Sequence, residues 1–230
     1  CGGNDSKDYW GDTSGGEDEE PTENPNASKP RYIWIDAAAN FPDFANSKEN
    51  IARDLALAKD AGFTDIVVDV RPTTGDVLFK TNLVDQVKFM YAWIGSNYTK
   101  VERTATWDYL QAFVDEARKQ GLSIHAAINT FVGGNQIDGG TGLLYRDQSK
   151  AEWATQMNMQ VGITSVMNTS ESTKFFNPAH PEVQTFLCDL LKDLAGYDLD
   201  GIFLDRGRFL NLQADFSEES RKQFEEYMGG

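Results

Sequence analysis

Short apolar runs alternate with longer amphipathic stretches along the chain after residue 30. Four of the runs are rich in β-branched residues, are nearly continuous in hydrophobicity, and end in a polar or charged side chain. Such runs are typical of strands that are buried on both faces of a parallel sheet. The pattern therefore predicts strands over residues 32–36, 65–72, 123–129 and 201–205.

The intervals between these runs carry helical periodicity. Apolar residues recur three and four positions apart over residues 47–61, 106–120 and 181–195, and a charged helix is predicted over 217–228. Gly62 and Gly121 stand where a helix C-cap is expected, and Pro181 stands at a first helical position. The spacing of Ser149 and Glu152 is that of a capping box and predicts one more helix start.

Strands that alternate with helices indicate a parallel sheet with crossover connections. A (β/α)₈ barrel and an open, doubly wound sheet both fit this order. The chain has no Gly-x-Gly-x-x-Gly after the first strand and no P-loop, so the main sequence evidence for a nucleotide-binding fold is missing. A (β/α)₈ TIM barrel has eight strands and about 250 residues. We therefore expect an α/β, TIM barrel-like fold of which residues 31–230 form the first half, about four β/α units.

The first 30 residues differ in composition from the rest of the chain. They hold eight carboxylates, two lysines and many small or turn-forming residues, and Tyr9 and Trp10 are their only large apolar side chains. Such a segment buries too little apolar surface to offset the entropy of ordering, so residues 1–30 are predicted to be a disordered acidic tether and 31–230 the domain.

A cysteine at position one with an acidic tether after it resembles a bacterial lipoprotein of the Bacteroidetes type after removal of its signal peptide. The resemblance implies that Cys1 carries a lipid. It also implies that the protein is extracytoplasmic and anchored to the outer membrane, with the cell surface as one location. The alternative is that Cys1 is a chance fragment end.

Charge excludes two classes of partner. The chain carries 36 acidic and 21 basic residues, a formal net charge of -15. A nucleic-acid binder needs a basic face, and adsorption to anionic lipid through side chains needs basic residues as well. The chain has two cysteines, Cys1 and Cys188, which are too few for a disulfide framework or a cysteine zinc site. Cys188 is predicted to be buried. No cofactor motif or metal-ligand spacing is present, and we expect neither a cofactor nor a metal.

The candidate chemistry lies where the predicted strands end, because sites in α/β folds form at the carboxyl ends of the strands. Asp205 is the sharpest candidate, since arginines nearby could keep its carboxylate ionised as a nucleophile or charge stabiliser. The spacing of Asp69 and Arg71 predicts that both side chains face the same side of their strand. Capping or ion pairing is the alternative interpretation for any one of these residues. The complete set is Asp36, Asp69, Arg71, Asn129, Asp205, Arg206 and Arg208.

Six ordered motifs resemble the glycosyl hydrolase-like 10 family of (β/α)₈ proteins. The segments with counterparts in that family are 31–35, 67–72 (Val-Val-Asp-Val-Arg-Pro), 121–129, 176–183, 197–205 (Tyr-Asp-Leu-Asp-Gly-Ile-Phe-Leu-Asp) and 215–217 (Asp-Phe-Ser). The chain departs from the family pattern at Ala127, where a Trp is common. The resemblance also implies further strands after the last motif.

The resemblance implies a glycoside hydrolase that cleaves a polysaccharide or oligosaccharide, with Asp205 as a catalytic carboxylate and the other six residues as substrate-binding groups. Glycoside hydrolysis generally uses two carboxyl groups. The second is expected on a later strand, with Asp36 and Asp69 as less favoured substitutes. A non-catalytic glycan-binding lipoprotein and an inactive pseudoenzyme fragment are the alternatives.

Overall fold

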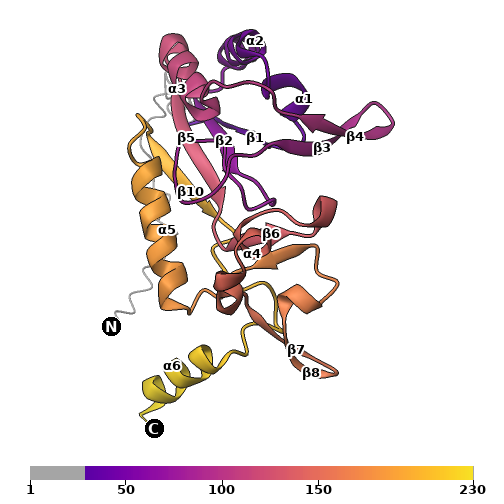
Figure 1. Ribbon diagram of the computed structural model, residues 1–230. Coiled ribbons are helices and arrows are strands. Elements are labelled where there is room, and N and C mark those ends of the chain that lie inside the picture. Colours follow the sequence, from indigo (N-terminus) through magenta and orange to yellow (C-terminus); the bar gives the residue numbers. More distant parts are fainter. Residues whose placement is uncertain (1–28, 230) are drawn as a thin grey trace, which may run out of the picture.

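A four-stranded parallel sheet forms the centre of the protein. The computed structural model describes residues 29–229, and its main sheet has the strand order β1-β2-β5-β10 (Figure 1). The four strands are β1 (Tyr32–Ile35), β2 (Asp65–Arg71), β5 (Ser123–Asn129) and β10 (Gly201–Asp205). Each neighbouring pair is parallel, so the four predicted strands and the α/β class are confirmed.

Helices lie between these strands in the chain and one more follows β10, and the four longest of them correspond to the four predicted helical ranges. The helices are α1 (Phe41–Phe44), α2 (Lys48–Asp60), α3 (Tyr109–Gln120), α4 (Leu143–Arg146), α5 (Pro181–Leu194) and α6 (Glu218–Met228). The predicted cap residue Ser47 accepts a hydrogen bond from the Asn50 N–H, and Gly121 adopts the left-handed conformation at φ 68°. Helix α3 begins three residues after the start of the predicted range, because the Asp108 carboxylate caps it by accepting the Gln111 N–H.

The two faces of the sheet have different surroundings. Helices α2 and α3 pack against each other, and α3 contacts β2 and β5 over a core that includes Ile66, Val68 and Ile124. On the opposite face, the rings of Tyr32 and Trp34 are 48% and 45% exposed. Since β1 and β10 are the edges of the described sheet, this second face is open to solvent at both edges.

Three two-stranded antiparallel sheets interrupt the β/α order and were missed by the sequence pattern. They are β3 (Phe89–Ile94) with β4 (Asn97–Glu102), β6 (Val132–Asn135) with β9 (Thr173–Phe175), and β7 (Gln156–Met159) with β8 (Gly162–Ser165). Their outward faces carry aromatic or polar side chains in short runs, so neither the alternation nor the length of a core strand marks them.

Two local predictions were wrong. Residues 148–153 form a 3₁₀ helix, η2 (Gln148–Trp153), whose cap is Asp147; the Ser149 hydroxyl donates to the Asp147 carboxylate at 2.6 Å. Asp147 takes the cap because its carboxylate also accepts the Ser149 N–H at 3.0 Å. Cys188 is exposed because it lies on the solvent side of α5, away from Leu187 and Leu190.

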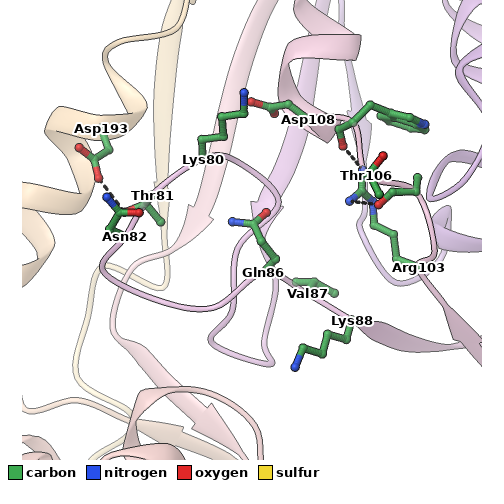
Figure 2. A pocket seen from close by; sticks show the side chains of 12 residues that line it. Lys80, Thr81, Asn82, Gln86, Val87, Lys88, Arg103, Thr106, Asp108 and Asp193 are labelled. Atoms are coloured by element: carbon green, nitrogen blue, oxygen red, sulfur yellow. Dashed lines mark hydrogen bonds between the residues drawn. The ribbon is translucent and has the colours of Figure 1, made fainter.

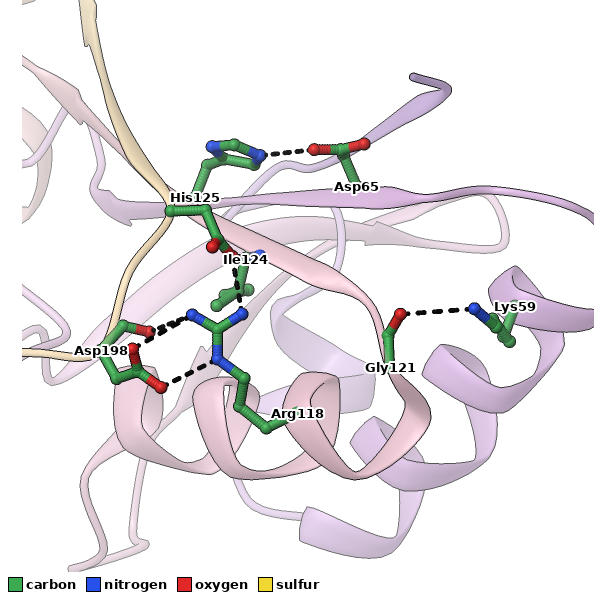
Figure 3. A network of polar contacts seen from close by, with 8 residues as sticks. Lys59, Asp65, Arg118, Gly121, Ile124, His125 and Asp198 are labelled. Carbon is green, nitrogen blue, oxygen red and sulfur yellow. Dashed lines mark hydrogen bonds and ion pairs between the residues drawn. The ribbon is translucent and has the colours of Figure 1, made fainter. Parts of the chain in front are cut away.

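Polar contacts at the amino ends of the strands fix β10 beside β5 (Figure 3). Arg118 at the end of α3 pairs with Asp198 at 2.9 Å and with Asp200 at 2.7 Å, and these carboxylates raise its pKa. Asp200 in turn accepts the Ile124 N–H at 2.8 Å. Arg118 and Asp200 together therefore join the end of α3, the loop before β10 and strand β5.

His125 occupies the inner part of the open face. Its Nε2 lies 2.7 Å from the Asp65 carboxylate, and the residue is 8% exposed (Figure 3). A Cβ atom on Gly201 would come within 2.7 Å of the His125 Nδ1, so this ring requires glycine at the start of β10. His125 is thus packed against the sheet, in agreement with its place in a buried strand of the sequence pattern.

The Asp-Phe-Ser motif is an anchor for α6. Burial of the Asp215 carboxyl opposes its ionisation, but the hydrogen bonds it accepts outweigh this and lower its pKa. The donors include the Ser220 hydroxyl at 2.6 Å and the Gln156 N–H at 2.7 Å. Asp215 therefore joins the start of α6 to β7.

The expectations for Cys1 and for most of the 1–30 tether lie outside the described residues and stay predictions. Within residues 29–229, no helix has the length and apolar character needed to cross a bilayer.

Phe113 provides a test of the α2–α3 core. Its ring is fully buried and lies 5.5 Å from Phe44 and 5.0 Å from Tyr109, centroid to centroid. We expect Phe113→Ala to lower the free energy of unfolding by about 3–5 kcal/mol, because the cavity removes dispersion contacts on all sides. Urea denaturation measures this. Phe224→Ala on α6, where the ring is 63% exposed, should change the value by less than about 0.5 kcal/mol.

Candidate functional site

An acidic hollow lies where the parallel strands end. It has a volume of about 130 Å³. Five of the seven residues predicted from the sequence line it: Asp36, Asp69, Asn129, Asp205 and Arg206. Asp36 follows β1, Asp69 lies near the end of β2, Asn129 ends β5 and Asp205 ends β10. This hollow, the acidic pocket, is therefore built by all four strands, and the in-register pairing of Asn129 with Asp205 places their side chains on one face.

Asp69 is the most perturbed carboxyl group of the acidic pocket. Its residue is 7% exposed, and burial raises its pKa to about 7, with the nearby charges of Asp36 and Asp205 acting in the same direction. A hydrogen bond from the Arg71 N–H opposes this rise. The Asp69 carboxyl group therefore holds a proton over much of the range below neutral pH, as a general acid must.

Asp205 differs from Asp69 in being exposed to solvent. One of its carboxylate oxygens accepts the Arg206 N–H at 2.8 Å, and its carbonyl oxygen accepts the Thr130 N–H at 2.8 Å. Arg206 has a positive φ of 48°, which turns the chain sharply after β10. The alternative interpretation of Asp205 as a member of an ion pair is not seen: among residues 29–229, no ion pair joins it to Arg206 or Arg208.

Arg71 supports the acidic pocket from outside. The residue is fully buried, and its guanidinium donates to the carbonyl oxygens of Asn129 at 2.5 Å, Thr130 at 3.3 Å and Val132. The prediction that it faces the same side as Asp69 is wrong, because the register shifts between them: Asp69 pairs with Ala127, and Arg71 pairs with Ile128. A bulge of this kind redirects a side chain.

Asn129 and Arg71 hold each other in place. The Asn129 amide donates to the Arg71 carbonyl at 2.9 Å, while Arg71 donates back to the Asn129 carbonyl. Asn129 is 6% exposed and still lines the acidic pocket. Its place at the end of β5 is thus fixed by main-chain contacts on both sides.

Two further predicted residues have local roles. The Asp36 carboxylate accepts the Ala39 N–H at 2.7 Å, so it caps the turn after β1 and also lines the acidic pocket. Arg208 does not line it. Its guanidinium donates to the Phe209 carbonyl at 3.0 Å and the Leu210 carbonyl at 2.5 Å, and it lies 5.7 Å from the Phe175 ring centroid.

Sequence reasoning missed the apolar wall of the acidic pocket. Trp34, Pro72 and Met90 line it together with the carboxyl groups. Trp34 could have been found, because it stands two positions before Asp36 and a strand alternates its faces. Met90 could not, because it reaches the pocket from the β3–β4 hairpin, whose fold position the sequence does not indicate.

A larger hollow of about 720 Å³ lies outside the sheet, between the 80–88 loop, residues 103–108 and α5 (Figure 2). Its carboxylates already have structural partners. Asp193 accepts the Thr81 hydroxyl at 2.6 Å, and Asp108 accepts the Tyr197 hydroxyl at 2.5 Å besides capping α3. Arg103 donates to main-chain carbonyls. This hollow therefore lacks a pair of free carboxyl groups for acid–base chemistry.

The acidic pocket combines an exposed carboxylate, a buried carboxyl group with a raised pKa and a neutral amide. Two carboxyl groups in different environments can serve as the proton donor and the nucleophile or base of a hydrolytic reaction. Within residues 29–229 no group of three histidine, cysteine or carboxylate side chains is arranged to hold a metal ion.

The raised pKa of Asp69 predicts a pH dependence of stability. A carboxyl group whose pKa is raised on folding stabilises the protein below its unfolded pKa near 4, and this contribution is lost as the pH rises through about 7. The wild type should therefore lose more unfolding free energy between pH 4.5 and 7.5 than Asp69→Asn, which keeps an acceptor for the Arg71 N–H. Urea denaturation at both pH values measures the difference. Equal losses in the two proteins would show that Asp69 titrates normally.

Comparisons with solved structures show the same type of fold. A crystal structure of a hypothetical protein from Ruminiclostridium thermocellum aligns with a TM-score of 0.52 at 15% identity, over 86% of this chain and 89% of that one. An alpha-L-fucosidase from Paenibacillus thiaminolyticus aligns with a TM-score of 0.54 at 18% identity, over 86% of this chain and 26% of that one. These neighbours support an α/β fold of the TIM-barrel type.

Comparison of sequences gives a closer relationship. An S-layer-related protein from Niallia circulans is 31% identical over 203 residues, which are 86% of this chain but 12% of that protein's length. The sequence profile of the glycosyl hydrolase-like 10 family matches residues 29–229, nearly the whole of the part whose structure is described. The chain therefore belongs to the glycosyl hydrolase-like 10 family.

Proposed function

We propose that the protein hydrolyses a glycosidic bond in a polysaccharide or oligosaccharide, with Asp205 as a catalytic carboxylate. The observation that carries the proposal is the convergence of Asp36, Asp69 and Asp205 on one hollow at the carboxyl ends of β1, β2 and β10. Family membership supports the same class of reaction.

The chemistry requires different roles for the carboxyl groups. In glycoside hydrolysis one group donates a proton to the leaving oxygen, and another stabilises or attacks the oxocarbenium-like centre. Asp205 is the exposed carboxylate and suits the second role. Asp69 has the raised pKa of a proton donor. A carboxyl group on a later strand is the alternative donor, because Asp69 lies deep in the pocket at 7% exposure.

The four strands are proposed to be the first four of a (β/α)₈ barrel. Three features support this: the strands are parallel and in sequence order, α2 and α3 cover one face, and the opposite face exposes Tyr32, Trp34 and Phe203. In a closed barrel the face without helices is the interior, which is filled by layers of side chains. Further strands between the two edges would enclose these rings.

The test is Asp205→Asn in the full-length protein, with release of reducing sugar from plant, fungal and bacterial polysaccharides as the measurement. We expect turnover to fall at least about a hundred-fold, because the amide can neither attack nor carry the required charge. The matched control is Asp189→Asn, whose carboxylate pairs with Lys192 on the outer surface of α5 and should leave turnover unchanged.

Unchanged turnover in Asp205→Asn would remove Asp205 from the mechanism. Saccharide binding by the wild type without any hydrolysis would instead establish the non-catalytic, glycan-binding alternative.

A further inference from the structure

A second hollow adjoins the acidic pocket. It has a volume of about 340 Å³ and lies between the β3–β4 hairpin and the segment that follows β6. The two hollows share three lining residues, Ala38, Thr73 and Met90. They are therefore neighbouring parts of one depression that runs from the ends of the parallel strands to the hairpin, which projects from the sheet in Figure 1.

Aromatic rings form the hairpin side of this second hollow. Phe89, Tyr91 and Tyr98 line it, and the Tyr91 and Tyr98 rings are stacked with centroids 5.4 Å apart and planes inclined by 30°. Trp93 lies next to them, 5.2 Å from the Tyr98 centroid. Tyr98 and Trp93 are 57% and 68% exposed, so these aromatic residues lie at the surface and not in the core.

The opposite side of the hollow is polar and uncharged. Asn135, Gln136 and Ser172 line it, and no charged side chain does. The Gln136 amide lies 3.3 Å from the Ser172 hydroxyl, so these groups already form a small hydrogen-bonding array. Amides and hydroxyls that face aromatic rings match a ligand with apolar C–H faces and hydroxyl groups around its edge.

A set of contacts at the rim holds the aromatic side in place. Asp138 accepts the Tyr91 hydroxyl at 2.9 Å and pairs with Lys100 at 2.7 Å, and Lys100 lies 4.3 Å from the Phe89 centroid. The two rim charges neutralise each other, so the hollow presents no net charge to a ligand. Such preorganisation reduces the entropy lost on binding.

We propose that this hollow is a saccharide subsite that holds a neutral sugar unit next to the unit bound at the acidic pocket. The inference rests on the proposed function and deepens it. The acidic pocket by itself, at about 130 Å³, is smaller than the roughly 300 Å³ of an ordinary ligand site. The substrate class is thus a neutral oligosaccharide of several units, which the Tyr91–Tyr98 pair contacts through a sugar face.

The test measures binding of a printed array with neutral gluco-, manno-, xylo- and N-acetylchito-oligosaccharides of one to six units, with oligogalacturonides as the acidic arm. Calorimetry on the strongest binder then gives the affinity. We expect a neutral oligosaccharide to bind best, and Tyr98→Ala to weaken it about ten-fold or more, since truncation removes a central aromatic contact. Tyr98→Phe keeps the ring and should stay within about two-fold.

The matched control is Tyr227→Ala, a tyrosine 86% exposed on α6, which should bind as the wild type does. Absence of binding to every neutral oligosaccharide, preference for the oligogalacturonides, or wild-type affinity in Tyr98→Ala would each overturn the subsite.

Asp205→Asn separates this inference from the proposed function. If Asp205→Asn abolishes hydrolysis but Tyr98→Ala leaves the oligosaccharide affinity unchanged, the subsite is overturned and the proposed function is supported. If Tyr98→Ala weakens binding and the wild type hydrolyses no bound oligosaccharide, the proposed function is overturned and the subsite is supported.

Discussion

The buried guanidinium of Arg71 is the interaction on which the carboxyl end of the sheet depends. Removing a cation from water is costly unless hydrogen bonds replace its hydration. Burial lowers the pKa of Arg71 to about 10, and the charges of Asp76 and Asp69 oppose that shift. Its two terminal nitrogens donate to the carbonyl oxygens of Asn129, Thr130 and Val132. The chain leaving β5 is thereby held over the end of β2, and the β6 segment continues from that position.

The same contacts define the electrostatics of the acidic pocket. The bulge that turns Arg71 away from Asp69 leaves the Asp69 carboxyl group without a side-chain cation, facing Asp36 and Asp205. Had Arg71 paired with it, a low pKa would result. The structure thus separates a positive charge that supports the main chain from the acidic groups that face the depression. The proposed hydrolysis of a glycosidic bond needs this division, because a proton donor must retain its proton at the working pH.

Much of the fold was predictable because buried strands and capped helices leave strong local signals. Residues 123–129 and 201–205 are strands at the predicted bounds, and Ser47, Gly121 and Pro181 take their predicted positions at helix ends. The two-stranded antiparallel sheets carried no comparable signal. The β3–β4 hairpin buries Met90 and Ala92 on one side only and exposes Trp93, so its short alternation is ambiguous by itself. The cap of η2 is Asp147 and not the predicted Ser149. Both residue types are good helix caps, so the sequence does not indicate which of the two is used.

The sequence by itself determined the strand order along the chain, the family motifs and the polar residues that end each strand, because these depend on local hydrophobicity and spacing. It placed Asp36, Asp69, Asn129 and Asp205 at strand ends, and the structure brings these four to one pocket. Only the tertiary structure decided that Arg71 supports the pocket from outside, that Asp69 has the raised pKa, and that Tyr91 and Tyr98 stand beside it. Those properties arise from sheet register, burial and contacts between segments far apart in the chain, none of which a local pattern specifies.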